Sequence, residues 1–175
     1  MHHHVYLIGF MGSGKSTVGP VLAERLGRAW VDTDRLLIDR LGMSIAEYFS
    51  RYGEEAFRRE ERSLLFALAS SALPLVVSTG GGIVIDPDNR RRLRETGLVV
   101  HLFAPLSEIR RRIGDDPSRP LWSRQNDRNL VELYRLRHRL YRETAHCALS
   151  TVRYAPREAA ERIVGALRED VEKRD

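Results

Sequence analysis

A glycine-rich segment near the start of the chain has the residue types and spacing of a phosphate-binding loop. Residues 9–16 read GFMGSGKS, which fits the pattern GxxxxGK[ST] between a predicted strand and a predicted helix. Glycines allow backbone N–H groups to converge on phosphate oxygens, and the N-terminus of the following helix adds its dipole. Lys15 would place a compact charge at the β- and γ-phosphates of a nucleotide, and Ser16 would ligate Mg²⁺. The alternative, a glycine-rich turn with an incidental lysine, is disfavoured by the flanking strand and helix.

The scarcity of lysine supports a chemical role for Lys15. Of the 29 cationic residues, only Lys15 and Lys173 are lysines, and the other 27 are arginines. A chain that uses arginine for almost all of its positive charge has retained a lysine in the middle of a glycine-rich segment. An arginine fork would be too bulky for the phosphate cradle, so this exception favours nucleotide binding.

Two carboxylates stand at the end of the second predicted strand, where residues 30–34 read WVDTD. In an extended chain, residues two apart point to the same side, so Asp32 and Asp34 are expected to face one place. At the carboxyl end of a parallel sheet that place is the crevice where ligands bind. One carboxylate could hold Mg²⁺ through water while the other accepts a proton from an attacking hydroxyl. The alternative is that Asp34 only caps a helix starting at Arg35.

A run of three glycines, Gly80, Gly81 and Gly82, follows the third predicted strand. Adjacent glycines let a substrate approach exposed backbone N–H groups closely. A flexible turn is the alternative, and triple glycine by itself is a weak signal. Its place at the carboxyl end of a strand favours a binding role.

Several arginines are further candidates for anion binding. Arg58 follows Glu54 by four residues, so an exposed ion pair on a helix is the simpler interpretation. Arg119 lies in residues 114–127, a polar, proline-containing stretch without a helical or strand period, which is a candidate mobile lid. An arginine carried on a lid over a phosphate site is the arrangement of an arginine finger. Arg137 lies on the helix after this stretch, and Arg110 to Arg112 could be a solvated helix face. Spacing alone leaves open whether each of these arginines binds a ligand or only lies on a solvated surface.

Short apolar runs alternate along the chain with stretches of helical period. This alternation predicts a parallel sheet covered by helices on both faces. The expected strands are 5–8, 29–31, 75–77, 98–103 and 148–152. The expected helices are 17–26, 35–41, 44–51, 54–71, 87–95, 105–113, 128–144 and 156–171.

Length and composition narrow the class of protein. The 175 residues fit one domain spanning 1–175, and 42% apolar with 30% charged residues is typical of folded chains. The longest apolar run, residues 64–69, is far shorter than the roughly 20 residues of a membrane-spanning helix. Cys147 is the only cysteine, so no internal disulfide is expected and a cytoplasmic location is favoured. The net charge is +5, but the arginines are interleaved with acidic residues along the chain. This favours a small anionic substrate over nucleic acid.

Six motifs in order and spacing resemble the shikimate kinase family. They are GFMGSGKST, VDTD, GEEAFRREE, STGGG, RPL and RxxLYRE, and the resemblance extends from Val5 to about Val164. It implies a three-layer α/β/α P-loop kinase fold, with a five-stranded parallel sheet in the order 2-3-1-4-5 and a mobile lid. It also implies transfer of the γ-phosphoryl of ATP to the 3-hydroxyl of shikimate, in the route to aromatic amino acids.

The resemblance implies a role for each matching residue and region. The phosphate loop would be 9–17, the substrate-binding helical region about 34–62 and the lid about 114–127. Lys15, Asp34 as base and Arg119 would be catalytic, and Ser16 and Asp32 would hold Mg²⁺. Nucleotide binding would involve Gly12, Ser13, Gly14, Lys15, Ser16, Thr17, Arg119, and, around adenine, Arg112, Arg153 and Pro156. Shikimate would be bound by Asp34, Arg58, Gly80, Gly81, Gly82 and Arg137. The partners expected of this monomer are ATP and shikimate, with no nucleic acid and no membrane.

Three other classes of protein compete with this interpretation. A related small-metabolite or nucleotide kinase would share the phosphate loop but lack the combination of Arg58, the triple glycine and Arg137. A noncatalytic ATP-binding module would lack the base, whereas Asp34 is present. A nucleic-acid binder would need a concentrated basic patch, and the arginines here are scattered.

Overall fold

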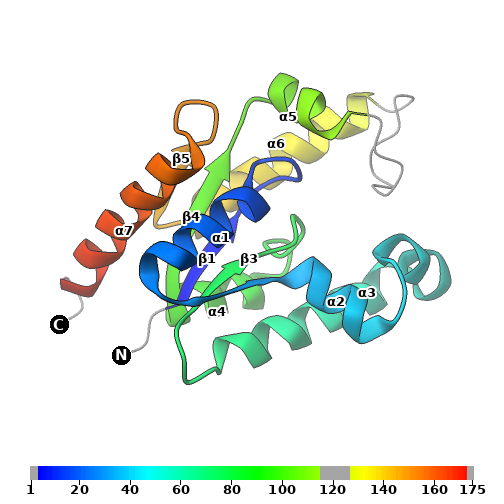
Figure 1. The fold of residues 1–175 in the computed structure, drawn as a ribbon. Helices are drawn as coiled ribbons and strands as arrows, with labels where there is room; N and C mark the ends of the chain where they lie inside the picture. The colour runs from blue at the N-terminus through cyan, green and yellow to red at the C-terminus, as the bar shows by residue number, and fades with distance from the viewer. Residues whose placement is uncertain (1–3, 115–126, 173–175) are drawn as a thin grey trace.

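A five-stranded parallel sheet forms the centre of the computed structural model, which describes residues 4–114 and 127–172 (Figure 1). The strands lie in the order β2-β3-β1-β4-β5, so the predicted architecture is confirmed. Their bounds are β1 His4–Ile8, β2 Ala29–Asp32, β3 Leu75–Ser78, β4 Gly97–Phe103 and β5 Cys147–Ser150. In register, Val5 of β1 lies between Val76 of β3 and Leu98 of β4.

Seven helices in the described residues connect and cover the strands. They are α1 Lys15–Leu26, α2 Thr33–Leu41, α3 Ile45–Ala69, α4 Pro87–Thr96, α5 Leu106–Ile113, α6 Asp127–Thr144 and α7 Pro156–Glu172. Capping side chains explain where two of these helices begin. Ser44 is the N-cap of α3, and its side chain accepts from the backbone N–H of Glu47. Asp86 is the N-cap of α4, and Pro87 is the first residue of that helix.

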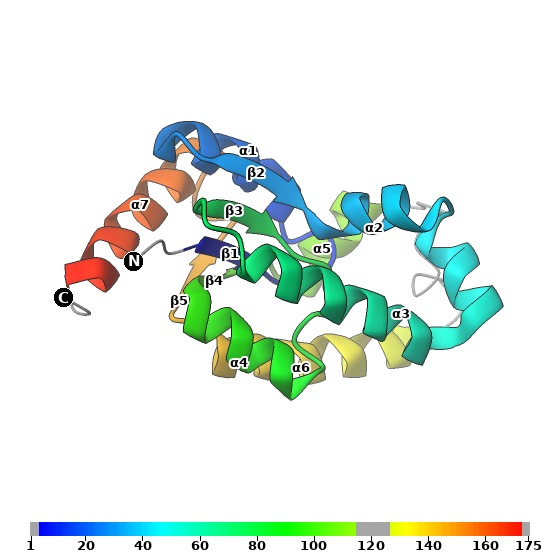
Figure 2. The same cartoon turned by 90° about the horizontal axis from the view of Figure 1, so that it is seen from below.

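The alternation of side chains along β1 divides the core into two layers. Val5 and Leu7 pack with residues of α1 and α7, among them Leu22. Tyr6 and Ile8 point to the opposite face and pack with residues of α3, α4 and α6. Figure 2 shows the two helical layers on either side of the sheet. Both faces of the strand are therefore buried, as the continuous apolar sequence predicts.

Helix α3 contains a break at Gly53. The sequence predicts two helices, 44–51 and 54–71, and α3 runs through both with one residue of non-helical backbone, at φ 80° and ψ 169°. Glycine adopts this positive φ without the steric cost that a Cβ would bring. The break separates the first part of α3 from the part that carries Glu54, Arg58 and Glu61.

Part of the sequence-based interpretation lies outside the described residues. The expected lid at 114–127 is described only at its two ends, Gly114 and Asp127, so the lid and Arg119 stay predictions. Among the described residues, no helix is long and apolar enough to cross a membrane. The cytoplasmic location, the monomeric state and the absence of a nucleic-acid partner also stay predictions.

Candidate active site

A cavity of about 520 Å³ lies at the carboxyl ends of the strands. Its walls come from the loop after β1 and the first turn of α1, the end of β2 and the start of α2, the segment after β3, one residue of α5, and the turn that joins β5 to α7. Many of the predicted nucleotide and metal residues therefore meet in one place. The lining residues from the predicted set are Gly12, Gly14, Lys15, Ser16, Thr17, Asp32, Asp34, Gly81, Arg112 and Pro156.

Lys15 is held against the carbonyl groups of its own loop. Its Nζ donates to the carbonyl oxygens of Gly9 at 2.8 Å and Phe10 at 3.0 Å. Its backbone carbonyl accepts from the Ser78 hydroxyl at 2.9 Å, which ties the start of α1 to the end of β3. The preceding Gly14 has a φ of 100°, which an L side chain rarely adopts. The loop thus presents a buried ammonium group to the cavity without an arginine-sized side chain.

Asp32 contacts both the phosphate loop and helix α2. Its Oδ2 accepts from Ser16 Oγ at 2.7 Å, and its Oδ1 accepts from the backbone N–H groups of Asp34 at 3.0 Å and Arg35 at 3.3 Å. Asp32 is therefore the N-cap of α2, which begins at Thr33. The alternative in which Asp34 caps a helix starting at Arg35 is wrong, because Asp32 satisfies these N–H groups.

Asp34 lies in the first turn of α2 and lines the cavity. Strand alternation was the wrong reason for pairing it with Asp32, since β2 ends at Asp32. Its carboxylate lies over Gly80: a Cβ added there would stand 2.6 Å from Asp34 Oδ1 and 3.0 Å from Glu61 Oε1. The Gly80 N–H donates to the Thr33 hydroxyl at 2.9 Å, which fixes this approach. A side chain at position 80 would therefore have to displace the Asp34 carboxylate.

Arg58 forms the expected helix pair with the exposed Glu54 and a second ion pair with Glu61, which is buried. Its Nη1 donates to Glu61 Oε2 at 2.7 Å, its Nη2 donates to Glu54 Oε1 at 3.1 Å, and the Glu61 side chain is only 1% exposed. A Cβ added at Gly82 would stand 2.2 Å from Arg58 Nη1, so the guanidinium lies directly against this glycine. Burial raises the pKa of Glu61, the negative charge of Asp34 adds to the rise, and Arg58 opposes it.

Arg137 on α6 is 4% exposed, with its guanidinium 5.9 Å from the centre of the Phe10 ring. Its Nε has no hydrogen-bond partner in the described part of the chain. Burial lowers the pKa of Arg137, and the positive charge of Arg58 adds to the fall. Four residues further along α6, the Tyr141 hydroxyl donates to the Gly81 carbonyl, behind the triple-glycine turn. A buried cation that repels a second one favours an anionic ligand between them.

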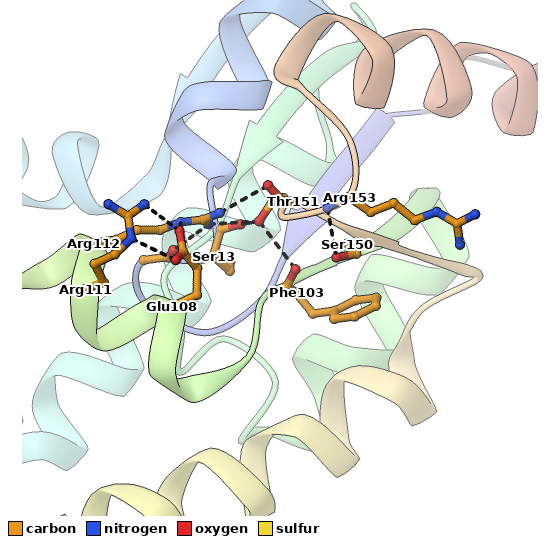
Figure 3. A network of polar contacts seen from close by, with 9 residues as sticks. Ser13, Phe103, Glu108, Arg111, Arg112, Ser150, Thr151 and Arg153 are labelled. Atoms are coloured by element: carbon orange, nitrogen blue, oxygen red, sulfur yellow. Dashed lines mark hydrogen bonds and ion pairs between the residues drawn. The ribbon is translucent and has the colours of Figure 1, made fainter.

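A polar cluster joins α5, the phosphate loop and the turn after β5 (Figure 3). Arg112 donates through Nε to Glu108 at 2.8 Å, through Nη1 to the Gly12 carbonyl at 3.2 Å and to Thr151 Oγ1 at 2.9 Å. Hydrogen bonds from Arg111, and secondly from Arg112, lower the pKa of Glu108 to about 2. Figure 3 shows Arg153 directed away from this cluster, and its guanidinium lies over Tyr154 at 5.4 Å.

The family model described as shikimate kinase matches residues 11–168. The chain belongs to the shikimate kinase family. It is 49% identical over 152 residues to a shikimate kinase of Paracidovorax citrulli, covering 85% of this chain and 82% of the relative. It is 39% identical over 167 residues to one of Enterococcus faecalis, covering 94% of this chain and 98% of the relative.

Solved shikimate kinases share the fold of this chain. One from Acinetobacter baumannii, in complex with shikimate, superposes with a TM-score of 0.90 at 37% identity over 96% of this chain and 94% of that one. One from Aquifex aeolicus gives a TM-score of 0.84 at 32% identity over 96% and 98%. The resemblance drawn from the six motifs is confirmed, and this family member is a kinase by fold and family.

Sequence reasoning did not assign roles to four residues that the structure places in or beside the site. Glu61 lies three residues after Arg58, but nothing in the sequence marks that helix face as buried. Tyr141 falls within the LYRE stretch, and its hydroxyl faces the glycine turn. Thr151 and Tyr154 line the cavity because β5 ends at Ser150, two residues before the expected strand end. Polar residues in the turn after β5 are the signal that could have found them.

His101 on β4 gives a prediction about the pH dependence of stability. It is 1% exposed, its Nδ1 has no hydrogen-bond partner among the described residues, and its ring lies 5.1 Å from that of His138. Burial lowers the pKa of His101 from 6.5 to about 3, and the charges of His138 and Lys15 add to the fall. Between these pH values the unfolded chain binds more protons at this position, so the free energy of unfolding falls as the pH falls.

We therefore expect the His101→Leu variant to be less acid-sensitive than the wild type. Between about pH 6 and pH 4 the wild type should lose about 2 kcal/mol of unfolding free energy that the variant keeps. Urea denaturation at a series of pH values measures this difference, with each protein referred to its own value near neutral pH. Parallel pH profiles for the two proteins would contradict a neutral buried imidazole.

Proposed function

We propose that this chain transfers the γ-phosphoryl of ATP to the 3-hydroxyl of shikimate, giving shikimate 3-phosphate and ADP. The observation that carries the proposal is the single cavity that joins the phosphate loop, with Lys15, to Asp34 and Gly81. Phosphoryl transfer to an alcohol requires a phosphate cradle and a proton acceptor within one site. Family membership supports ATP and shikimate as the two substrates.

The phosphate loop would bind ATP through its backbone and Lys15. On binding, the Lys15 ammonium would exchange its contacts with the Gly9 and Phe10 carbonyls for the negatively charged phosphate oxygens. The N-terminus of α1, which begins at Lys15, adds its dipole at the same place. Once ATP is bound, these groups would be in place before the reaction. They would stabilise the negative charge that develops on the transferred phosphoryl group without reorganisation.

Ser16 and Asp32 fit a bound Mg²⁺. Ser16 Oγ and Asp32 Oδ2 are 2.7 Å apart, both residues line the cavity, and both offer the oxygen donors that this ion prefers. No cluster of three or more His, Cys, Asp or Glu side chains suited to a metal occurs in the described ranges. Mg²⁺ bound there would offset negative charge on the phosphates.

The buried cations would bind the carboxylate of shikimate. Arg137 is a nearly fully buried guanidinium, and Arg58 lies against Gly82, so both flank the triple-glycine turn. A guanidinium matches a planar carboxylate through two parallel hydrogen bonds. A carboxylate bound between them would offset the burial of Arg137 and its repulsion by Arg58, which together lower the pKa of Arg137.

Asp34 would act as the base. Its carboxylate would accept the proton of the shikimate 3-hydroxyl as that oxygen forms a bond to the γ-phosphorus and the bond to the ADP oxygen breaks. Gly80 leaves the space in which this carboxylate approaches the substrate turn. Placing the carboxylate on the first turn of α2, whose N-cap is Asp32, fixes it relative to Ser16.

A coupled ADP-release assay tests the proposed function. We expect ADP formation to depend on both shikimate and Mg²⁺, and nucleoside monophosphates to give no stimulation. Mass analysis should show one added phosphoryl group on shikimate. Turnover with a nucleoside monophosphate and none with shikimate would overturn the assignment.

Replacement of Arg137 by alanine is expected to weaken shikimate binding by about 2 kcal/mol, or about 30-fold, because a charge-assisted bond to a carboxylate is lost. ATP affinity should change little. Arg139→Ala is the matched control, since this arginine of the same helix is 77% exposed and pairs with Glu143. Binding of each substrate by calorimetry gives the result, and an equal loss of ATP affinity in Arg137→Ala would contradict it.

A further inference from the structure

We propose that Thr151 is a positioning residue for nucleotide binding, which holds the phosphate loop and Arg112 in one fixed arrangement. This inference rests on the proposed function only in taking ATP or ADP as the nucleotide of the cavity. Thr151 follows the last residue of β5 and lines the cavity with Gly12, Gly14 and Arg112.

The Thr151 hydroxyl connects two parts of the site through opposite hydrogen-bonding roles. Its Oγ1 donates to the Ser13 carbonyl at 2.8 Å and accepts from Arg112 Nη1 at 2.9 Å. The backbone of Thr151 is itself fixed, because its N–H donates to the Phe103 carbonyl at 2.9 Å, extending the ladder between β4 and β5. The hydroxyl therefore attaches the phosphate loop and Arg112 to the sheet.

Fixing the Ser13 carbonyl also fixes the next N–H group of the loop. The described chain contains no cis peptide, so the Gly14 N–H points away from the Ser13 carbonyl and hence away from Thr151. The Thr151 methyl group packs against Gly14, since a Cβ added there would stand 3.3 Å from Cγ2. Phosphate binding by a loop requires its N–H groups to hold one direction. Thr151 meets this requirement through its hydrogen bond to the Ser13 carbonyl.

Arg112 is fixed by the same residue. Its Nη2 donates to the Thr151 carbonyl at 3.1 Å, its Nη1 also donates to the Gly12 carbonyl at 3.2 Å, and Glu108 accepts from its Nε at 2.8 Å. All three guanidinium nitrogens thus have partners, and the plane of the group is set. Arg112 with its partners forms a rigid wall of the cavity rather than a mobile side chain.

The test compares two substitutions at Thr151 with one at a matched threonine. Thr151→Val removes the hydroxyl with little change of shape, and Thr151→Ser keeps it. Thr144→Val is the control, because the Thr144 hydroxyl is buried but donates only to the Leu140 carbonyl of its own helix. Calorimetry measures the Kd for ADP without shikimate and the Kd for shikimate without nucleotide, and thermal melting records the fold.

We expect Thr151→Val to weaken ADP binding about tenfold, the size of effect for a lost hydrogen bond to a charged partner, with the Kd for shikimate unchanged. Thr151→Ser should bind ADP as the wild type does, and Thr144→Val should leave both Kd values unchanged. If Thr151→Val does not fold, Thr151→Ala removes the same hydroxyl without placing a methyl group against the Ser13 carbonyl, and the same result is expected.

Two results would overturn the inference. One is wild-type affinity of the valine or alanine variant for ADP. The other is an equal loss of affinity for ADP and shikimate with no rescue by serine, which would make Thr151 a purely structural residue. Failure of the proposed function is a separate outcome, since the wild type would then bind ADP without phosphorylating shikimate while the Thr151 comparison still held.

Discussion

The Asp34→Asn variant is expected to turn over about 10²- to 10⁴-fold more slowly than the wild type, the range that general-base catalysis supplies. The amide keeps the size of the carboxylate but cannot accept the proton of the attacking hydroxyl. The variant should fold normally, because the N-cap of α2 is Asp32 and not Asp34. Steady-state kcat with saturating ATP and shikimate measures the effect.

Asp32→Asn is the contrasting substitution. Asp32 accepts from Ser16 and caps α2, so its change should mainly raise the Mg²⁺ concentration needed for half-maximal activity. A titration of Mg²⁺ separates the two carboxylates. Near-wild-type kcat in Asp34→Asn would remove the base from the mechanism and leave Asp34 as a substrate contact.

Lys15→Met is expected to reduce phosphoryl transfer by about 10³-fold or more, on the scale of other groups that stabilise transferred phosphoryl charge. Methionine is likewise unbranched, is one atom shorter and carries no charge. The Lys15 ammonium donates to two carbonyl groups of its own loop, and methionine would make neither contact.

The fold of Lys15→Met provides the control. Circular dichroism and the melting temperature should stay close to those of the wild type, and shikimate binding should be unchanged. An unfolded variant would instead mean that the ammonium group stabilises the loop itself. Lys15→Arg should also be inactive, because a bulkier fork would replace the compact ammonium group in the phosphate cradle.

Local patterns predicted the elements that carry the site. The strand, glycine loop and helix around Lys15 form one continuous signal, and the alternation of apolar runs with helices was sufficient for the layers of the fold. Asp34 was identified as a site residue, but the start of α2 was predicted two residues too late, because Asp32 and not Asp34 caps this helix.

Residues that depend on tertiary contacts were not predicted. The sequence suggests an exposed helix pair between Arg58 and Glu54, and only the packing of α3 against the glycine turn brings the buried Glu61 into the cluster. Thr151 acquires its contacts because the turn after β5 meets both α5 and the phosphate loop. Such contacts join segments that are 39 and 138 residues apart, and no local period records them.

The close approach of Arg58, Glu61, Gly80 and Gly82 limits how this site can change during evolution. Gly80 lies close to the Glu61 carboxylate and Gly82 lies against the Arg58 guanidinium. These two side chains form an ion pair with each other, and Glu61 is buried. Removing one partner of a buried ion pair leaves an uncompensated charge, which costs more than replacing both. The effects of substitutions in this cluster are therefore strongly non-additive when they are combined. An enzyme with a different acceptor specificity would be reached only by paired changes in this cluster.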